Sequence, residues 1–448
     1  MDNKENVKIE FNNDDLAEFS VENKNHSHHH SSSHHHSHHH HHRSRSKKEK
    51  AKRFMKRNKY KITNGFVAAL FVGILIVMGV LLDNVEKTNG NNANGSGNVI
   101  VESNVTLRLD IPLFDEAVSL AGPAVMEYMN SDISTPAYRV YKKYMSMGRL
   151  DKGVPVKLSY EIVSIPDGFS VSTVELFVSE NEKFSNSMVY HLSADETSVD
   201  VYNLKTNTQY HYKFVLSLSN GTRTSVEGCF KTADTPRMLS VDGGCNMRDI
   251  GGWKTIDGKI IKQGLLFRSA EIDGAVNSKY TVSAEGINTL LTVFGIRTDM
   301  DLRHESENPN GTDALGAGVK HNYYRAPMYA EAFTSSGKEK IRNIFSDLAD
   351  KNNYPILIHC THGMDRTGVV CYLLEAVLGV SEEDLMRDYQ LSVMYHGNLW
   401  SENQMNEFIG QLKSYEGATI QQKAVNYLLS AGVTESEIAS LKEIYLSK

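Results

Sequence analysis

Cysteine is scarce in this chain, which has only four cysteines among its 448 residues. They are Cys229, Cys245, Cys360 and Cys371. So few cysteines exclude a small secreted scaffold framed by disulfide bonds. Whether Cys229 and Cys245 pair with each other stays open at this level.

Acidic residues outnumber basic ones only slightly, and the formal net charge of −6 excludes a uniformly basic protein. The charge is unevenly spread, because Arg43 to Lys61 holds eleven Lys/Arg and a single Glu. Soon after come seventeen uninterrupted apolar residues, Phe66 to Leu82. Counted from Ile62, the segment is just long enough to cross a hydrocarbon core of ~30 Å. The sequence therefore predicts a transmembrane helix over residues 62–82.

The basic run sets the expected orientation of that helix. Positively charged segments stay on the cytoplasmic side, so the C-terminal bulk is expected outside the cytoplasm. The predicted location is the cell membrane, with a single span and an extracytoplasmic catalytic domain. Beside a membrane span, the basic run is expected to contact anionic lipid rather than nucleic acid.

The N-terminal tail, residues 1–61, is polar and low in complexity. Twelve of the nineteen histidines lie between His26 and His42, interrupted only by serines. Such a tract cannot build a packed core, so disorder is expected, although clustered imidazoles can also bind metal ions. Residues 83–99 are rich in Asn and Gly and are expected to be a flexible linker.

Residues 100–152 and 153–236 differ in pattern. The first segment has a helix-like portion but no assignable function, and is left as an unassigned subdomain or docking arm. The second alternates apolar and polar residues with a period of two, as in Tyr210 to Leu216. Short alternating strands separated by turn signals predict an all-β sandwich.

One strand of this sandwich resembles the tyrosine-corner strand of fibronectin type III domains, through Leu204, Thr208, Tyr210 and Tyr212. The match is partial, because both tryptophans, Trp253 and Trp400, lie outside the segment. A fibronectin III-like module would act as a spacer or adhesive domain. Cys229 is expected to be a small core residue there.

From about Met238 strands alternate with helical patterns, which indicates an α/β domain over residues 238–448. We expect a central, mostly parallel sheet flanked by helices. The stretch from Ile356 to Gly368 organises this domain. A short apolar strand leads to Cys360, five residues separate it from Arg366, and a helical pattern follows. Backbone amides at such a strand–loop–helix junction form a concavity that binds a tetrahedral oxyanion.

The residue types at this junction indicate phosphoryl transfer to sulfur. The positive field of the loop favours a thiolate at Cys360. The planar guanidinium of Arg366 matches two phosphate oxygens. His359-Cys360, five residues, then Arg366-Thr367 resembles the signature of the protein tyrosine phosphatase superfamily.

Further motifs resemble one bacterial group of that superfamily, the tyrosine and dual-specificity phosphatases with an Asp beside the loop arginine. They are Asn246-x-Arg-Asp-Ile-Gly-Gly252, Phe267-Arg-Ser269 and Asp301-Leu-Arg-x-x-x-Glu307. The group includes secreted mycobacterial phosphatases that also act on phosphoinositides. The resemblance covers roughly residues 238–448.

The resemblance implies a role for each loop residue. Cys360 is the nucleophile, and the phosphate is held by Thr361, His362, Gly363, Met364, Asp365 and Arg366. Thr367 is expected to hydrogen-bond the sulfur, and His359 to orient the loop. Asp365 is the leading candidate for the general acid and Asp301 the reserve. Neither a metal nor another cofactor is required by this chemistry.

Three functions remain open. The first is a membrane-anchored phosphotyrosine or dual-specificity phosphatase, acting on a phosphorylated protein or another phosphomonoester. The second is a phosphatase of phosphoinositides or inositol phosphates, which is weakened because Met364 stands where relatives often have Lys. The third is a catalytically weak surface adhesion protein. The run His359-Cys360-Thr361-His362-Gly363 also resembles the RNA 5′-triphosphatase part of capping enzymes. The Asn-x-Arg-Asp-Ile-Gly-Gly element and the expected extracytoplasmic location argue against that substrate. Cys371 is expected in the core, with a redox role beside Cys360 as the alternative.

Overall fold

The structure is a computed structural model that describes residues 108–447, except Pro112, Pro166, Thr235, 309–312 and 399–400. The predictions for the tail (1–61), the membrane span (62–82) and the linker (83–99) fall outside the described residues.

The predicted location needs correction. Within the described part of the chain, no helix is both long and apolar enough to cross a membrane. The longest helices described there have 14 residues. At 1.5 Å per residue such a helix reaches only about 21 Å, against a hydrocarbon core of ~30 Å. The prediction of a single-pass membrane protein with an extracytoplasmic catalytic domain is therefore wrong by this finding, and it is not retained.

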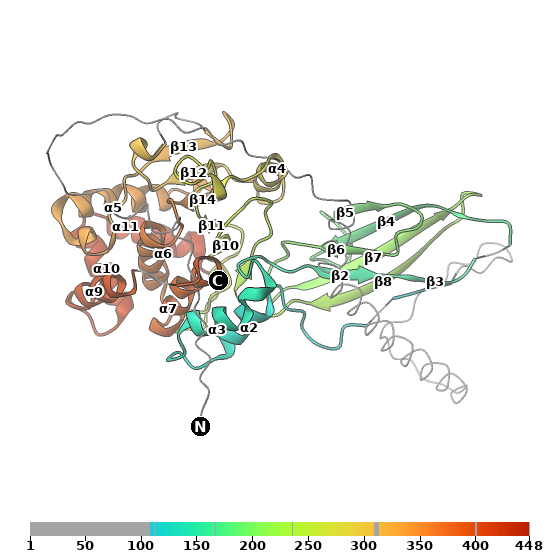
Figure 1. Cartoon of the computed structure of the whole chain (residues 1–448), viewed down its shortest axis with the longest axis horizontal. Helices are drawn as coiled ribbons and strands as arrows, with labels where there is room; N and C mark the ends of the chain where they lie inside the picture. Colours follow the sequence, from blue (N-terminus) through green and yellow to red (C-terminus); the bar gives the residue numbers. More distant parts are fainter. Residues whose placement is uncertain are drawn as a thin grey trace, which may run out of the picture. The chain divides into compact units, whose positions relative to one another are not determined.

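A six-stranded sheet forms the centre of the C-terminal part, in the order β13-β12-β14-β11-β10-β9 (Figure 1). Its first four strands are parallel and its last two are antiparallel. The strands are β9 (Arg237–Met238), β10 (Arg248–Asp249), β11 (Leu266–Ser269), β12 (Thr298–Asp301), β13 (Lys320–Tyr323) and β14 (Ile356–His359). The expectation of a mostly parallel sheet flanked by helices is confirmed.

Helices cover both faces of this sheet. Ile356 and Ile358 of β14 pack in one hydrophobic cluster with the helices that follow, whereas Leu357 packs in a second cluster with Leu290 of α4. Alternate side chains of a strand point to opposite faces, so β14 is buried on both sides. The helices are α4 (Ala284–Thr292), α5 (Ser335–Leu348), α6 (Asp365–Leu378), α7 (Glu382–Gln390), α8 (Val393–His396), α9 (Glu402–Lys413), α10 (Ile420–Ser430) and α11 (Glu435–Tyr445). Short 3-10 helices are η3 (Met145–Met147), η4 (Ser278–Tyr280), η5 (Glu305–Glu307), η6 (Tyr329–Phe333) and η7 (Lys351–Asn353).

Residues 156–231 form antiparallel strands with a hydrophobic core of their own. A four-stranded sheet has the order β5-β4-β7-β8, and two further pairs are β2-β6 and β1-β3. The strands are β1 (Arg108–Asp110), β2 (Val156–Ser159), β3 (Glu161–Ser164), β4 (Val171–Ser179), β5 (Met188–Leu192), β6 (Ser198–Val201), β7 (Gln209–Leu218) and β8 (Arg223–Lys231). Buried and less buried residues alternate along β7, as the period of two predicted.

The tyrosine-corner expectation has a local counterpart. The hydroxyl of Tyr210 accepts a hydrogen bond from the backbone N–H of Lys205 at 2.9 Å. That contact is of the kind a tyrosine corner makes, in which the hydroxyl returns to backbone a few residues upstream. The likeness of the whole module to fibronectin type III stays a prediction. Cys229 is exposed on β8, so the expectation of a core cysteine was wrong.

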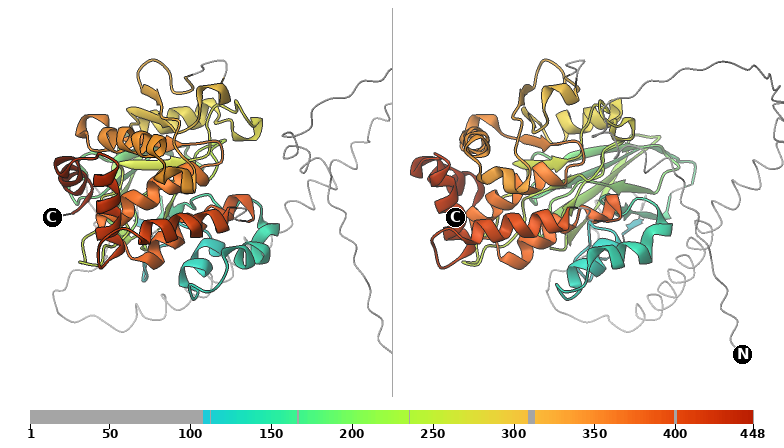
Figure 2. Two further views of the ribbon diagram at one scale, coloured as in Figure 1. Left: turned by 90° about the vertical axis from the view of Figure 1, so that its left-hand side faces the viewer. Right: turned by 60° about the vertical axis from the view of Figure 1, so that its left-hand side comes forward.

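The segment left unassigned by the sequence joins the α/β domain. It contains α2 (Pro123–Asn130) and α3 (Ala137–Tyr144), and both views of Figure 2 show these teal helices beside the orange C-terminal ones. Tyr128 is buried in the same hydrophobic cluster as α6. Arg387 of α7 donates to the carbonyl oxygens of Tyr128 and Ser131 at 2.9 and 2.7 Å. The helices α2 and α3 are therefore part of the packing of this domain.

Two glycines of the α/β domain allow a paired test of how tightly its backbone is packed. A Cβ on Gly251 would lie 2.4 Å from Gln263 Cα and 2.6 Å from the Lys262 carbonyl oxygen, whereas nothing lies within 4 Å of one on Gly410 in α9. We expect Gly251→Ala to destabilise the protein by about 1–3 kcal/mol, because backbone must shift. Gly410→Ala is expected to stabilise it by up to about 1 kcal/mol, through helix propensity. Urea unfolding of both variants measures the difference. Equal effects of the two would contradict the packing at Gly251.

Candidate active site

The candidate site is the loop between β14 and α6. Cys360 follows the last residue of β14 and is only 1% exposed. The helix α6 begins at Asp365, so its first turn closes the loop and directs its N-terminal end toward it. The positive end of a helix favours an anion at this position.

The outer side of the loop is held through its carbonyl groups. The N–H of Glu271 donates to the carbonyl oxygen of Thr361 at 3.1 Å. The guanidinium of Arg268 donates to the carbonyl oxygen of Gly363 at 2.9 Å.

The carbonyl between them, that of His362, has two donors. Asn246 Nδ2 lies 3.1 Å from this oxygen and His396 Nε2 lies 2.9 Å from it. A carbonyl can only accept, so His396 carries its proton on Nε2. Burial lowers the pKa of His396 to about 4, which keeps the ring neutral near pH 7.

Three successive carbonyls thus point away from the loop centre. In a planar trans peptide the next N–H points in the opposite direction. The N–H groups of His362, Gly363 and Met364 are therefore turned toward the concave side. Those of Gly363 and Met364 donate to no group within the described residues. Oriented amides of this kind form an anion-binding nest.

Gly363 is required by the shape of the loop. Its φ is +66°, a left-handed conformation that glycine adopts without strain. A Cβ there would lie 2.2 Å from the carbonyl oxygen of Ser269 on β11. Only glycine lets the loop approach β11 this closely.

A buried charge network supports the same side. Asp388 of α7 is 1% exposed and pairs with Arg248 at 2.8 Å and with Arg268. Burial raises the pKa of Asp388, but the two guanidinium groups outweigh burial and hold it below its usual value. Arg248 also donates to Asn246 Oδ1 at 2.8 Å. The Asn-x-Arg and Phe-Arg-Ser motifs therefore hold the loop from behind.

Arg366 already has an anionic partner. Its two terminal nitrogens donate to the carboxylate of Glu307 at 2.6 and 2.8 Å, and Thr361 Oγ1 donates to the same group at 2.9 Å. Burial raises the pKa of Glu307, but the pair with Arg366 prevails and lowers it to about 2. Arg366 Nε is buried and has no hydrogen-bond partner within the described residues. The guanidinium thus retains one buried donor.

His359 is part of a second buried cluster. Its Nε2 lies 2.9 Å from Asp299 Oδ1, at ion-pair distance though not aligned as a hydrogen bond. Burial opposes the charged imidazole, but Asp301 and Asp299 outweigh it and raise the pKa of His359 to about 9. Asp301 is fully buried and accepts three side-chain hydrogen bonds from Arg303 at 2.7–3.0 Å. Asp301 is therefore a structural ion-pair partner, with no exposed oxygen for proton transfer.

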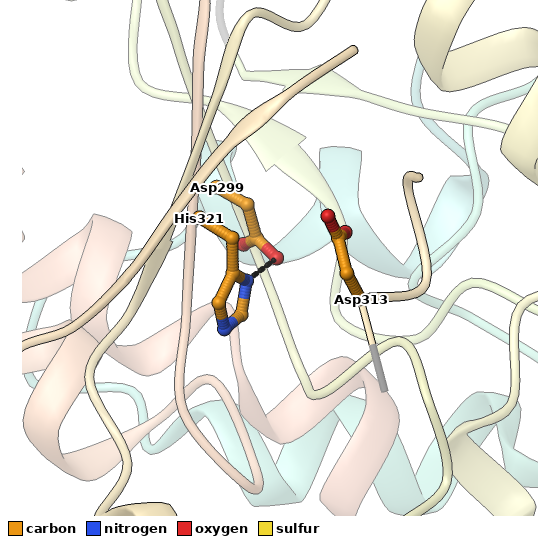
Figure 3. Close-up of side chains that lie close together, drawn as sticks. All are labelled: Asp299, Asp313 and His321. Carbon is orange, nitrogen blue, oxygen red and sulfur yellow. Dashed lines mark hydrogen bonds and ion pairs between the residues drawn. The ribbon is translucent and has the colours of Figure 1, made fainter. Parts of the chain in front are cut away.

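One group of described side chains has a metal-like arrangement, namely Asp299, Asp313 and His321 (Figure 3). Their ligand atoms lie within 4.8 Å of one another. His321 Nδ1 lies 2.8 Å from Asp299 Oδ2, and Asp313 Oδ1 accepts two backbone N–H groups at 3.1 Å. His321 Nε2 is buried without a hydrogen-bond partner within the described residues, but Asp299 Oδ2, Asp313 Oδ1 and His321 Nδ1 already have protein partners. We assign no metal to this group.

Asp365 is held by a tyrosine pair. Tyr329 donates to Asp365 Oδ1, and the hydroxyls of Tyr329 and Tyr389 lie 2.8 Å apart. Burial raises the pKa of Tyr329 well above its usual value, so this hydroxyl keeps its proton. One carboxyl oxygen of Asp365 is thereby fixed at the start of α6.

The structure brings most of the predicted site residues together in one loop. The surroundings of two of them are informative. The side chain of Met364 is fully buried in the core. Thr367 Oγ1 is buried and has no hydrogen-bond partner within the described residues, so its expected bond to the Cys360 sulfur is not formed here.

Several supporting residues were missed by the sequence reasoning. Glu307 is the last residue of the motif that begins at Asp301, but the motif predicted no role for it. Arg248 and Arg268 belong to the Asn-x-Arg and Phe-Arg-Ser motifs, which served only to identify the resemblance. Glu271, Asp388 and His396 gave no sequence signal, because they lie far along the chain from the loop. The one feature of the sequence that could have pointed to them is that polar residues stand there among apolar neighbours.

Comparison with known proteins supports the chemistry of this domain. Residues 239–447 match the family model described as "Tyrosine phosphatase family". A tyrosine-protein phosphatase of Nostoc commune is 24% identical, over 34% of this chain and 67% of the relative. A relative from Cupriavidus necator is 26% identical, over 34% of this chain and 61% of that protein. The catalytic core of the PP-IP phosphatase SIW14 from S. cerevisiae aligns with 17% identity and a TM-score of 0.25, over 36% of this chain and 89% of that one. A TM-score this low carries no argument about function.

The pair of Glu307 and Arg366 predicts a pH dependence of stability. The pKa of Glu307 is lowered from 4.5 to about 2, so its stabilising contribution is present above pH 4.5 and is lost as the pH falls toward 2. We expect Glu307→Gln to lower the melting temperature at pH 7 but to approach the native protein below about pH 3. Thermal unfolding at several pH values measures this. Glu339→Gln, on the exposed side of α5, is the control. A difference for Glu307→Gln that does not change with pH would contradict the ion pair.

Proposed function

Because residues 239–447 match the tyrosine phosphatase family, we propose that this domain is a cysteine-dependent phosphatase that hydrolyses phosphotyrosine. The observation that supports this proposal is the loop between Cys360 and Arg366. Its three carbonyls at Thr361, His362 and Gly363 are held by outside donors, which turns the N–H groups that follow them toward the concave side. A preorganised set of donors of this kind stabilises the charge that develops on a transferring phosphoryl group.

In the first step the thiolate of Cys360 attacks phosphorus. A sulfur–phosphorus bond forms while the bond between phosphorus and the leaving oxygen breaks. The inward amides and Arg366 hold the three phosphoryl oxygens. To do so, Arg366 must be shared between the phosphate and Glu307, and its buried Nε is the free donor for this purpose.

Asp365 acts as general acid in this step and gives its proton to the leaving oxygen. In the second step Asp365 takes a proton from water, which attacks phosphorus and releases inorganic phosphate and the thiolate. Asp301, the reserve candidate, is buried and paired with Arg303, which supports Asp365 rather than Asp301 as the acid.

Phosphotyrosine is favoured by the depth of the nucleophile. Cys360 is only 1% exposed, so the phosphate must reach below the protein surface, which a long aryl group allows. Phosphoinositides and inositol phosphates are the second candidate class. Met364 is uncharged and fully buried, so this position adds no cation for a polyanionic head group. The β module over 153–236 is proposed to act as a spacer.

A substrate panel tests this proposal on the full chain. Phosphotyrosine peptide is expected to be turned over faster than phosphoserine peptide or a phosphoinositide, with inhibition by vanadate. Cys360→Ser is expected to remove the activity, because it lacks the thiolate. No turnover of any of the three substrates, or full activity of Cys360→Ser, would overturn the proposal.

Asp365→Asn tests the general acid. We expect kcat to fall by about 10²–10³ on phenyl phosphate and by less on p-nitrophenyl phosphate, whose leaving group needs little protonation. Asp350→Asn is the matched control, because Asp350 is exposed and caps the short helix η7. An equal loss on both substrates would show that Asp365 is not the acid.

A further inference from the structure

We propose that Asp151 is a positioning residue for the phosphate loop, so that the segment before the β module completes the active site. Asp151 lies outside residues 239–447, the part that matches the family. The inference rests on the proposed function, because it assigns Asp151 to the same loop.

Asp151 is built into the interior rather than placed at a surface. It is 2% exposed, and Arg149 binds its two carboxylate oxygens at 2.6 and 2.7 Å. Arg149 also donates to the carbonyl oxygen of Gly244 at 2.8 Å. The charge of the buried carboxylate is thus compensated, as a buried acid requires.

The carboxylate of Asp151 reaches the loop through one residue. Asp151 Oδ2 accepts the backbone N–H of Asn246 at 2.7 Å. Asn246 has a φ of +52°, a left-handed conformation that asparagine adopts more readily than most residues other than glycine. In this conformation its side chain donates to the carbonyl oxygen of His362 and to Ser392 Oγ, at 3.1 and 3.2 Å.

A second line from the same segment ends on the same carbonyl. The guanidinium of Arg149 lies 4.6 Å from the ring centre of Tyr395, and the rings of Tyr395 and His396 are 4.9 Å apart. His396 Nε2 lies 2.9 Å from the His362 carbonyl oxygen. Both lines therefore converge on one peptide group of the loop.

That peptide group determines the direction of one donor of the nest. With the His362 carbonyl held outward, the N–H of Gly363 is turned inward. Loss of Asp151 would free Asn246 and remove one of the two donors to this carbonyl. Displacement of a transition-state donor by a fraction of an ångström lowers the rate and weakens anion binding.

The test compares two substitutions of Asp151 in the full chain. Asp151→Leu has a similar shape but cannot accept the Asn246 N–H, whereas Asp151→Asn keeps a carbonyl oxygen in reach. We expect Asp151→Leu to lower kcat/KM on p-nitrophenyl phosphate about tenfold and to raise the inhibition constant of inorganic phosphate by a similar factor. Asp151→Asn is expected to restore most of both.

Tyr128→Phe is the matched control. It removes the 2.6 Å hydrogen bond from Tyr128 to Gln390, which docks the same segment away from the loop. We expect this variant to lose melting temperature but to keep the native kcat/KM and phosphate affinity. Equal catalytic losses in Tyr128→Phe and Asp151→Leu would reduce Asp151 to a general docking residue and overturn the inference.

The remaining outcomes are also decisive. If Asp151→Leu does not fold by circular dichroism, Arg149→Met replaces it, because this variant keeps the carboxylate but removes the two hydrogen bonds from Arg149 that fix it. If whichever of these two variants folds keeps the native phosphate affinity and the native kcat/KM, the inference about Asp151 is overturned but the proposed function is not. A native protein that neither turns over phosphomonoesters nor binds phosphate would overturn the proposed function, and with it this inference.

Discussion

The site depends on one constraint, the outward fixation of three neighbouring carbonyls in the loop after Cys360. Each of them, on Thr361, His362 and Gly363, is held by a donor from another part of the chain. A loop of free peptides would turn some carbonyls toward a bound phosphate and repel it. Because these donors fix the peptides before any substrate arrives, the protein does not have to reorganise dipoles during the reaction.

Fixation of this kind needs buried charge. Arg268 reaches the loop from β11 and is compensated by Asp388 of α7, which it shares with Arg248. Breaking such a network by removal of one partner is costly, because the remaining charge stays buried without compensation. The network therefore joins the sheet, α7 and the loop into one unit, and the geometry of the loop is coupled to the stability of the domain.

The pair of Arg366 with Glu307 shows the same principle at the front of the loop. A carboxylate offers two oxygens in a plane and engages two donors of the guanidinium. It orients Arg366 and occupies part of its donor set, while Nε remains for another anion. The segment 100–152, which the sequence left unassigned, supplies Arg149 and Asp151, and these two residues extend the supporting shell behind the loop.

The sequence by itself determined the local chemistry. The apolar run Ile356–Ile358, the spacing from Cys360 to Arg366 and Gly363 specify a strand, a turn and a helix start, because short-range sterics and hydrogen bonding decide these. The period of two in β7 likewise predicted its strand. The tertiary structure alone decided which distant groups meet the loop, since Asp151, Asp388 and His396 are brought there by packing and carry no local signal. It also decided the exposure of Cys229 and the burial of Met364, because burial depends on which face of an element is covered.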